Sequence, residues 1–200
     1  MKMVEVPSIP EPQKVTLDAK TSALIIVDMQ NDFVNEKGKL YVGEAAKRTI
    51  PNIKRLLEKA RKSGATVVFT QDWHMEDDPE FPIWGKHAVA STWGSEIIEE
   101  LKPVEGEVII KKLRYDAFFG TPLDHILRIR GINNVVITGT VSNICVLHTA
   151  GSAALNLYKV YLPVDCVSAL TEFDQLAALR QISFLYKGTL TSSELLDFVP

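Results

Sequence analysis

The chain has only two cysteines, Cys145 and Cys166, among its 200 residues. Secreted disulfide-stabilised domains carry more, so this count excludes a disulfide scaffold and predicts free thiols in a reducing cytoplasm. Basic residues are not in excess either, because 22 Lys and Arg stand against 25 Asp and Glu, a formal net charge of −3. Nucleic-acid-binding domains usually carry a basic surplus, so we expect no nucleic-acid partner.

Long apolar runs are also missing. No run reaches the roughly 18 apolar residues that a transmembrane helix requires, so we expect no membrane association. The N-terminal stretch MKMVEVPSIPEPQK has no apolar segment after its first lysine, so it does not fit a signal peptide. With 46% hydrophobic and 24% charged residues, the composition is that of an ordinary globular protein of one domain.

Apolar runs and amphipathic segments alternate along most of the chain. Strands are predicted at residues 22–28, 65–70, 107–111, 134–138, 159–164 and 188–192, and helices at 45–63, 95–101, 122–130, 142–157 and 175–186. Continuous apolar runs such as SALIIV suit parallel strands buried on both faces. The alternation predicts an α/β fold, a Rossmann-like three-layer sandwich with a mostly parallel six-stranded sheet and helices on both faces.

Two stretches depart from this alternation. Residues 1–20 contain Pro7, Pro10 and Pro12 and are expected to form an extended arm over the domain or over a partner subunit, leaving residues 21–200 as the domain. Residues 71–94 are irregular and rich in aromatic side chains. A loop of that length inside a compact domain is usually functional.

Three reactive side chains fall where predicted strands end. Asp28 ends the first strand, Lys112 follows the third, and Cys145 lies past the fourth at a helix start. Ligands of such sheets bind outside the carboxyl ends of the strands, so we expect these groups to converge. The helix dipole and Lys112 are expected to lower the pKa of the Cys145 thiol, and Asp28 can accept its proton. Taken singly, each residue also suits a structural role: a core thiol, a capping carboxylate and a solvated lysine.

The turn around the candidate nucleophile has the sequence GTVSNIC, residues 139–145. Its backbone N–H groups at Val141 and Cys145 are candidates for an oxyanion hole. Cys166 also follows a strand, but no helix start comes directly after it, so we interpret it as structural.

The irregular loop carries a possible metal site. Asp72 and His74 lie two residues apart on an extended segment, which points both side chains the same way, and His87 can supply a third ligand. Three such ligands with open positions are typical of a catalytic site for Zn²⁺ or a similar cation. Phe33 and Trp84 are candidates to stack on a planar substrate ring. The alternative is a loop carboxylate, a partly buried histidine and ordinary core aromatics.

Three ordered segments make the chain resemble the isochorismatase-like cysteine hydrolases. Residues 28–33 (DMQNDF) look like the family's catalytic-Asp segment, residues 112–123 (KLRYDAFFGTPL) its catalytic-Lys segment, and residues 139–145 its nucleophile turn. The resemblance implies a catalytic triad of Asp28, Lys112 and Cys145. It also implies a non-proline cis peptide bond in the turn, expected here between Val141 and Ser142.

Within that family, the loop is similar to that of nicotinamidases, through DWH at 72–74, WGKHAV at 84–89 and TWGSE at 92–96. This implies that Asp72, His74 and His87 bind a divalent metal, with Zn²⁺ the first candidate, and that Phe33 and Trp84 contact the substrate ring. Residues 143–144 are Asn-Ile where nicotinamidases commonly have Asp-Tyr, which leaves the substrate open.

The leading hypothesis is therefore a nicotinamidase-type amidohydrolase that converts nicotinamide to nicotinate and ammonia through a thioester on Cys145. The family also implies a homo-oligomer, a dimer or larger. One alternative keeps the triad and changes the substrate to a ureido or carbamoyl compound or to isochorismate. The other is a metal-stabilised binding module in which Cys145 senses redox state.

Overall fold

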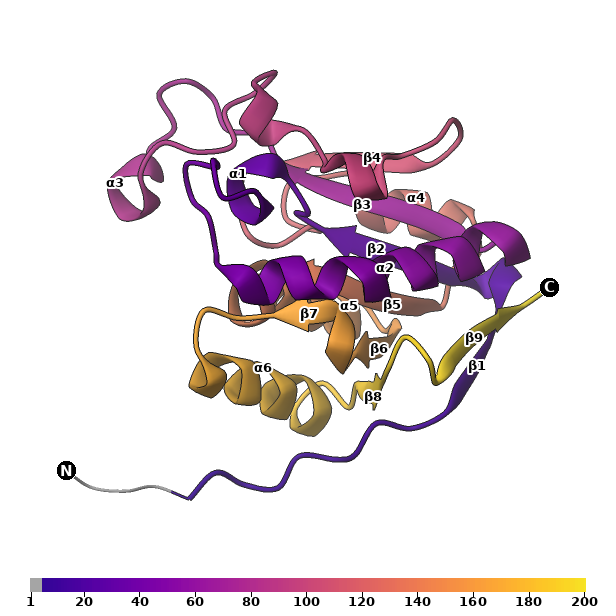
Figure 1. Ribbon diagram of the computed structural model, residues 1–200. Helices are drawn as coiled ribbons and strands as arrows, with labels where there is room; N and C mark the ends of the chain where they lie inside the picture. Colours follow the sequence, from indigo (N-terminus) through magenta and orange to yellow (C-terminus); the bar gives the residue numbers. More distant parts are fainter. Residues whose placement is uncertain (1–4) are drawn as a thin grey trace.

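A parallel β-sheet lies between two layers of helices in the computed structural model, which describes residues 5–200 (Figure 1). The strand order is β4-β3-β2-β5-β6-β8, with β7 paired to the end of β5. The strands are β2 (Ser22–Val27), β3 (Thr66–Asp72), β4 (Val108–Lys112), β5 (Asn134–Thr140), β6 (Lys159–Pro163), β7 (Val167–Ser168) and β8 (Thr189–Thr191). The α/β three-layer prediction is confirmed.

The sheet has seven strands rather than the predicted six. The additional strand, β7, is two residues long and pairs in parallel with Gly139 and Thr140 at the end of β5. Two residues are too few to carry a periodic signal, so only the fold reveals this strand. A separate two-stranded sheet, β1 (Val15–Asp18) with β9 (Leu196–Val199), was likewise not predicted, because its partners lie at opposite ends of the chain.

The helices are α1 (Asn31–Val34), α2 (Glu44–Ser63), α3 (Phe81–Trp84), α4 (Leu123–Ile129), α5 (Leu147–Leu155) and α6 (Glu172–Phe184). All six residues of β2 are buried, and they alternate between two cores. Leu24 and Ile26 pack in the core that contains α2, whereas Ala23, Ile25 and Val27 pack in the core of α4, α5 and α6. Burial on both faces explains why β2 is apolar throughout.

The predicted helix at 95–101 is wrong in part. The chain forms two short 3₁₀ turns, Trp93–Ser95 and Glu99–Leu101, with an extended segment between them. That segment runs beside the residues that follow β2: Gln30 and Ile97 form an antiparallel bridge, and the Ile98 N–H donates to the Met29 carbonyl at 3.0 Å. This pairing across the chain replaces the local hydrogen bonds of a helix.

The described part of the predicted arm, from residue 5 onward, runs past α6 and β8 of its own domain (Figure 1). The Gln13 N–H donates to the Leu190 carbonyl at 2.8 Å, and the Thr191 hydroxyl donates to the Gln13 carbonyl at 2.8 Å. The arm ends in β1, which is part of the folded domain, and residues 1–4 lie outside the described residues. Among residues 5–200, no helix is both long and apolar enough to cross a membrane.

Candidate active site

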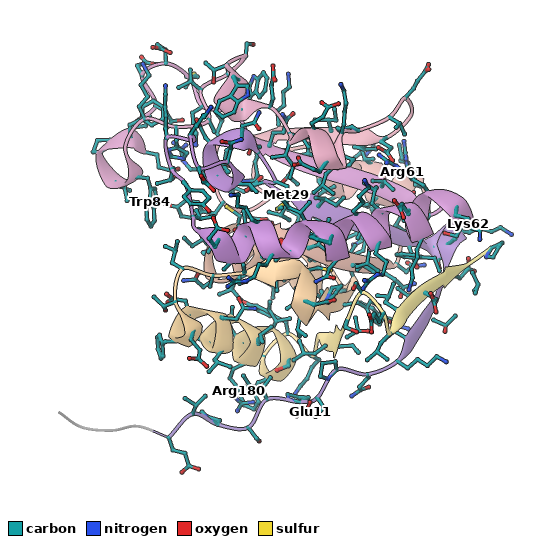
Figure 2. The ribbon with its side chains drawn as sticks, viewed as in Figure 1. Glu11, Met29, Arg61, Lys62, Trp84 and Arg180 are labelled. Carbon is teal, nitrogen blue, oxygen red and sulfur yellow. The ribbon has the colours of Figure 1, made fainter. Side chains whose placement is uncertain are left out.

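The carboxyl ends of four neighbouring strands surround a cavity of about 240 Å³. Asp28 follows β2, Asp72 ends β3, Lys112 ends β4, and Cys145 lies beyond β5. This end of the molecule is the one where Trp84 projects from α3, far from Arg61 and Lys62 at the other end of α2 (Figure 2). The cavity is lined by Asp28, Phe33, Leu40, Tyr41, Val42, Asp72, Glu80, Trp84, His87, Tyr115, Thr140, Val141, Ile144, Cys145 and Leu170.

The fold brings together the three side chains of the predicted triad. The Lys112 Nζ atom lies 2.7 Å from Asp28 Oδ2 and 3.8 Å from Cys145 Sγ, and it also forms an ion pair with Asp72. The Lys112 side chain is fully buried, and Asp28 is 1% exposed. A buried ammonium group is therefore held between two carboxylates and one thiol, an arrangement in which each charge depends on the others.

The two carboxylates have different proton affinities. Burial raises the pKa of Asp28, and the opposing charge of Lys112 does not cancel this effect. Burial also acts on Asp72, but Lys112 and a contact with His74 outweigh it and lower the pKa of Asp72 to about 2. Burial disfavours the Lys112 ammonium, yet the two carboxylates hold its pKa well above the ordinary value. Asp28 is thus the more basic carboxylate and is the better proton acceptor.

The expected direction of the thiol shift is wrong. Burial raises the pKa of the Cys145 thiol well above its ordinary value, although Lys112 opposes this effect, because Asp28 and Asp72 add to it. Cys145 is only 7% exposed, so the loss of hydration outweighs the attraction of the lysine. The resting thiol is therefore protonated, and a nucleophilic role requires a base beside it.

Two further residues hold Asp28 and Asp72 in place, one through a carboxylate and one through the backbone, and sequence reasoning missed both. The Thr70 hydroxyl donates to Asp28 Oδ1 at 2.6 Å, and Asp28 itself has a left-handed backbone with φ of +51°. The Gln30 side chain accepts from the Asp72 N–H and donates to the Asp72 carbonyl, both at 2.8 Å. In the sequence, Thr70 and Gln30 stand out only as polar residues inside or just after an apolar strand. Because a buried polar group without a partner is costly, such residues are expected to form hydrogen bonds.

The nucleophile turn differs from expectation in one detail. The cis peptide bond lies between Thr140 and Val141, not between Val141 and Ser142. β5 runs through Thr140, two residues beyond the predicted end of the strand, so the cis bond directly follows the last strand residue. Residues Ser142–Val146 form a π-helical turn that leads into α5. Val141 and Cys145 both line the cavity, and the oxyanion hole formed by their N–H groups remains a prediction.

The predicted metal ligands also lie together. Ligand atoms of Asp72, His74 and His87 are within 4.8 Å of one another, and all three residues are buried. His87 Nδ1 contacts the Gly85 carbonyl oxygen at 2.8 Å, and His74 Nδ1 contacts Asp78 Oδ2 at 3.1 Å. Because these contacts engage the Nδ1 atom of each histidine, the Nε2 atom of each ring is the one left to bind a metal. Among the described residues, His74 Nε2 is one of the few buried polar atoms without a hydrogen-bond partner.

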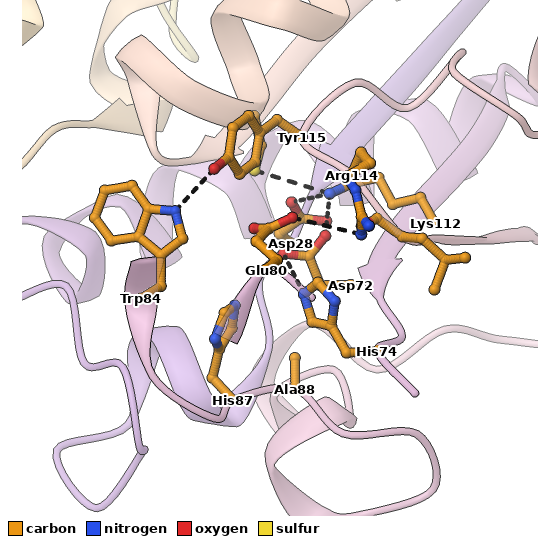
Figure 3. A network of polar contacts seen from close by, with 12 residues as sticks. Asp28, Asp72, His74, Glu80, Trp84, His87, Ala88, Lys112, Arg114 and Tyr115 are labelled. Atoms are coloured by element: carbon orange, nitrogen blue, oxygen red, sulfur yellow. Dashed lines mark hydrogen bonds and ion pairs between the residues drawn. The ribbon is translucent and has the colours of Figure 1, made fainter. Parts of the chain in front are cut away.

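The loop supplies charged residues that sequence reasoning did not single out. Arg114, which follows β4, has its Nη1 atom 3.2 Å from each carboxylate oxygen of Asp78 and 3.6 Å from Glu80 Oε2. Figure 3 shows Arg114 and Glu80 in the same network as His74. Asp78, Glu80 and His74 form a second group with ligand atoms close together. The available signal was the position of Asp78 and Glu80 within the long irregular loop.

The two predicted ring contacts line the same cavity. Phe33 packs edge-on against His87, with ring centroids 5.5 Å apart. The Trp84 indole donates to the Tyr115 hydroxyl at 2.8 Å (Figure 3). Tyr115, which belongs to the Lys112 segment, therefore fixes the Trp84 ring at the cavity. The cavity combines aromatic walls with the buried charges beneath them.

A family model described as the isochorismatase domain matches residues 22–194. The chain belongs to the isochorismatase-like cysteine hydrolase family. The match covers the three ordered segments and the loop, so the resemblance seen in the motifs is confirmed over nearly the whole chain.

The relatives and structural neighbours include enzymes named for different amide substrates. The ureidoacrylate amidohydrolase RutB of Caulobacter segnis is 33% identical over 96% of this chain and 90% of its own length. The structure of N-carbamoylsarcosine amidase from Thermoplasma acidophilum is 36% identical, with a TM-score of 0.80 over 87% of this chain and 97% of its own. The structure of Pyrococcus horikoshii pyrazinamidase in complex with zinc is 34% identical, with a TM-score of 0.81 over 86% and 99%.

These relatives favour the ureido or carbamoyl alternative over the nicotinamidase hypothesis. Curated amidohydrolases of ureidoacrylate match at 32–38% identity, whereas nicotinamidases and pyrazinamidases enter here as structural neighbours. Family membership also favours an enzyme over a binding module with a redox-sensing cysteine.

Proposed function

We propose that this family member hydrolyses the terminal C–N bond of a small ureido or carbamoyl compound and releases ammonia. The convergence of Asp28, Lys112 and Cys145 in one cavity carries the proposal. The ureidoacrylate and N-carbamoylsarcosine enzymes among the relatives support this substrate class. The cavity volume of about 240 Å³ suits a small substrate.

The proposed chemical steps follow from which groups of the site can accept or donate a proton. Asp28 accepts the thiol proton while Cys145 Sγ attacks the carbonyl carbon, and the backbone N–H groups of Val141 and Cys145 donate to the developing oxyanion. Protonated Asp28 then gives its proton to the departing nitrogen, and ammonia leaves an acyl or carbamoyl group on sulfur. Asp28 next takes a proton from water as the water attacks this group. Sulfur then leaves and takes this proton from Asp28, which restores both groups, and the substrate carbonyl is released as a carboxylic or carbamic acid.

Lys112 makes these chemical steps feasible inside a buried site. Its positive charge offsets negative charge on Asp28, Asp72 and the sulfur, whichever of them holds it. Its short distance to both Asp28 and Cys145 keeps that charge near the proton path throughout. Such fixed charge stabilises a transition state without reorganising solvent.

The residues of the loop fit a divalent cation. Asp72, His74 and His87 would hold it, since the unpartnered His74 Nε2 is a suitable donor and Asp78 fixes the ring from the other side. When bound, a cation such as Zn²⁺ supplies a Lewis acid that can orient a ligand atom of the substrate. Its presence and identity remain a proposal.

Nicotinamide is the second candidate substrate. The histidine cluster, the aromatic side chains Phe33 and Trp84, and the zinc-bound pyrazinamidase among the structural neighbours favour it. A heteroaromatic ring between aromatic side chains would place its carboxamide at Cys145. The carboxamide and ureido groups share the same –CO–NH₂ end, so one mechanism serves both.

A substrate panel tests the proposal. Ammonia release is measured with ureidoacrylate, N-carbamoylsarcosine and nicotinamide, each with and without a chelator. We expect kcat/KM at least about tenfold higher for a ureido or carbamoyl compound than for nicotinamide. A reversed preference that a chelator removes would favour the nicotinamidase hypothesis. Absence of ammonia with every compound would contradict an amidohydrolase.

The acid side of the pH profile should report Asp28. Since burial raises the pKa of Asp28, the base loses its charge as pH falls through a value above the ordinary 3.8. kcat/KM should therefore decline toward acid with an apparent pKa above that of an ordinary carboxyl group, while activity persists at higher pH. A pH–rate profile checks this. An acid limb at the ordinary carboxyl value would contradict the assignment of Asp28 as base.

Removal of the His74 imidazole should weaken metal binding. Zn²⁺ affinity, measured by titration calorimetry, is expected to fall at least about 100-fold in His74→Ala, and about tenfold in Asp78→Asn, which loses the ring's orienting carboxylate. His125→Ala is the control, since this exposed histidine of α4 lies outside the cluster. Equal affinity in all three variants would place the metal elsewhere.

We also propose a reducing cytoplasm as the working compartment, because Cys145 and Cys166 are both free and the mechanism needs a reduced thiol. A homo-oligomer remains a proposal as well, and light scattering of the purified chain measures it.

A further inference from the structure

One buried hydroxyl at the cavity has no partner in the protein. Among residues 5–200, the side-chain polar atoms that are buried without a hydrogen bond are Asp28 Oδ2, His74 Nε2, Asn143 Oδ1 and Thr140 Oγ1. Asp28 faces Lys112, and His74 belongs to the histidine cluster. Of the remaining two residues, Thr140 lines the cavity. Buried polar atoms are normally satisfied, so this hydroxyl requires an explanation.

The position of Thr140 is next to the reacting groups. Thr140 is the last residue of β5, and the preceding residue, Gly139, pairs with Val27, directly before Asp28. Cys145 follows Thr140 within the nucleophile turn. In the segment 140–145, the cavity is lined by Thr140, Val141, Ile144 and Cys145, of which Thr140 and Cys145 bring polar side-chain atoms. Thr140 thus lines the cavity as a residue, and its hydroxyl is an enclosed, unpartnered polar group within an otherwise apolar part of the wall.

Neighbouring buried hydroxyls all have structural partners, which makes Thr140 an exception. Thr138, two residues earlier on β5, donates to the Ile25 carbonyl at 3.2 Å. The Thr70 hydroxyl donates to Asp28, and Ser142 donates to Gln175 Oε1 at 2.6 Å. A threonine that served only to hold the turn would bond to it in the same way. Thr140 is 2% exposed and bonds to none of these elements.

We propose that the Thr140 hydroxyl is a substrate-binding group that accepts a hydrogen bond from an N–H of the ureido or carboxamide group held at Cys145. The inference rests on the proposed function, and it names a residue that selects for nitrogen-bearing substrates. An apolar wall at this point would leave the substrate N–H without a partner after its water is removed. The hydroxyl satisfies it when substrate is bound.

A pair of matched variants separates this role from a structural one. Thr140→Val keeps the branched shape and removes the hydroxyl, and Thr138→Val does the same to the bonded threonine on the same strand. We expect Thr140→Val to raise KM about tenfold with kcat changed less than about threefold, and its melting temperature to equal or exceed that of the wild type. Thr138→Val should leave KM unchanged and lower the melting temperature by about 2–4 °C. Thr140→Ser, which restores the hydroxyl, should recover most of the lost kcat/KM.

The outcomes are distinguishable. A Thr140→Val variant that keeps the wild-type KM, or that loses melting temperature as Thr138→Val does, overturns the role of Thr140 while the activity stands. Failure of Thr140→Ser to recover activity overturns it as well. A wild-type protein that releases no ammonia from any ureido or carboxamide compound removes the proposed function, and the role of Thr140 falls with it.

Discussion

Cys145→Ala should abolish ammonia release, with kcat lowered by roughly 10³-fold or more, because the thiol forms the covalent intermediate. The fold should survive, since the change removes one sulfur atom from a residue that lines a cavity rather than the centre of a core. Ammonia release under saturating substrate and a thermal melt together measure both effects.

Cys166→Ala is the matched control for this prediction. Cys166 is also a free, buried thiol, but it lies in the core on the α2 side of the sheet and does not line the cavity. Its replacement should leave kcat/KM within about threefold of the wild type. If Cys145→Ala retained activity comparable with Cys166→Ala, the thiol would have no part in the chemistry and another nucleophile would be required.

Lys112→Met should both inactivate and destabilise the protein, by about 3–5 kcal/mol. The lysine lies between two buried carboxylates, Asp28 and Asp72, and its loss leaves them facing each other without a positive charge. In the folded state the pKa of Asp28 would rise further, and the pKa of Asp72 would rise above the ordinary 3.8. At a pH where the same carboxyl groups are ionised in the unfolded chain, this rise lowers the free energy of unfolding of the variant. The loss of stability therefore becomes smaller as the pH falls toward the ordinary carboxyl pKa. Denaturant unfolding at several pH values measures this.

Lys111→Met provides the comparison within the same strand. Lys111 is exposed, and its Nζ atom lies 3.7 Å from the ring centre of Trp73. Loss of this cation–π contact should cost about 0.5–1 kcal/mol and leave activity in place. A Lys112→Met protein as stable as Lys111→Met at neutral pH would mean that the two carboxylates do not share a buried charge.

Much of the fold could be predicted because its signals are local. The runs that became β2, β3 and β5 are continuous and apolar, and they are so because helices cover both faces of the sheet. The topology of parallel strands then places the ends of those strands at one edge, which is why Asp28, Lys112 and Cys145 could be grouped from a sequence alone.

The parts that could not be predicted depend on partners far away in the chain. β1 exists only because β9 lies beside it, and the segment between the two 3₁₀ turns is extended because it pairs with Gln30. The pKa of the Cys145 thiol could not be predicted either. Burial decides whether this pKa is raised or lowered, and no local sequence pattern indicates how deeply Cys145 is buried. Thr70, Asp78 and Arg114 became visible as site residues only through the atoms they contact.

The side chain of Gln30 holds both ends of the loop between Asp72 and Ser95. Its amide nitrogen donates to the carbonyls of Asp72 and Ser95, and the Gln71 amide also donates to the Ser95 carbonyl. Both ends of the intervening loop, which carries His74, His87 and Trp84, are thereby fastened to the end of β2. A change in the length or composition of the loop between these two anchor points would therefore leave Asp28, Lys112 and Cys145 in place, whereas the side chains that the loop itself brings to the cavity would change.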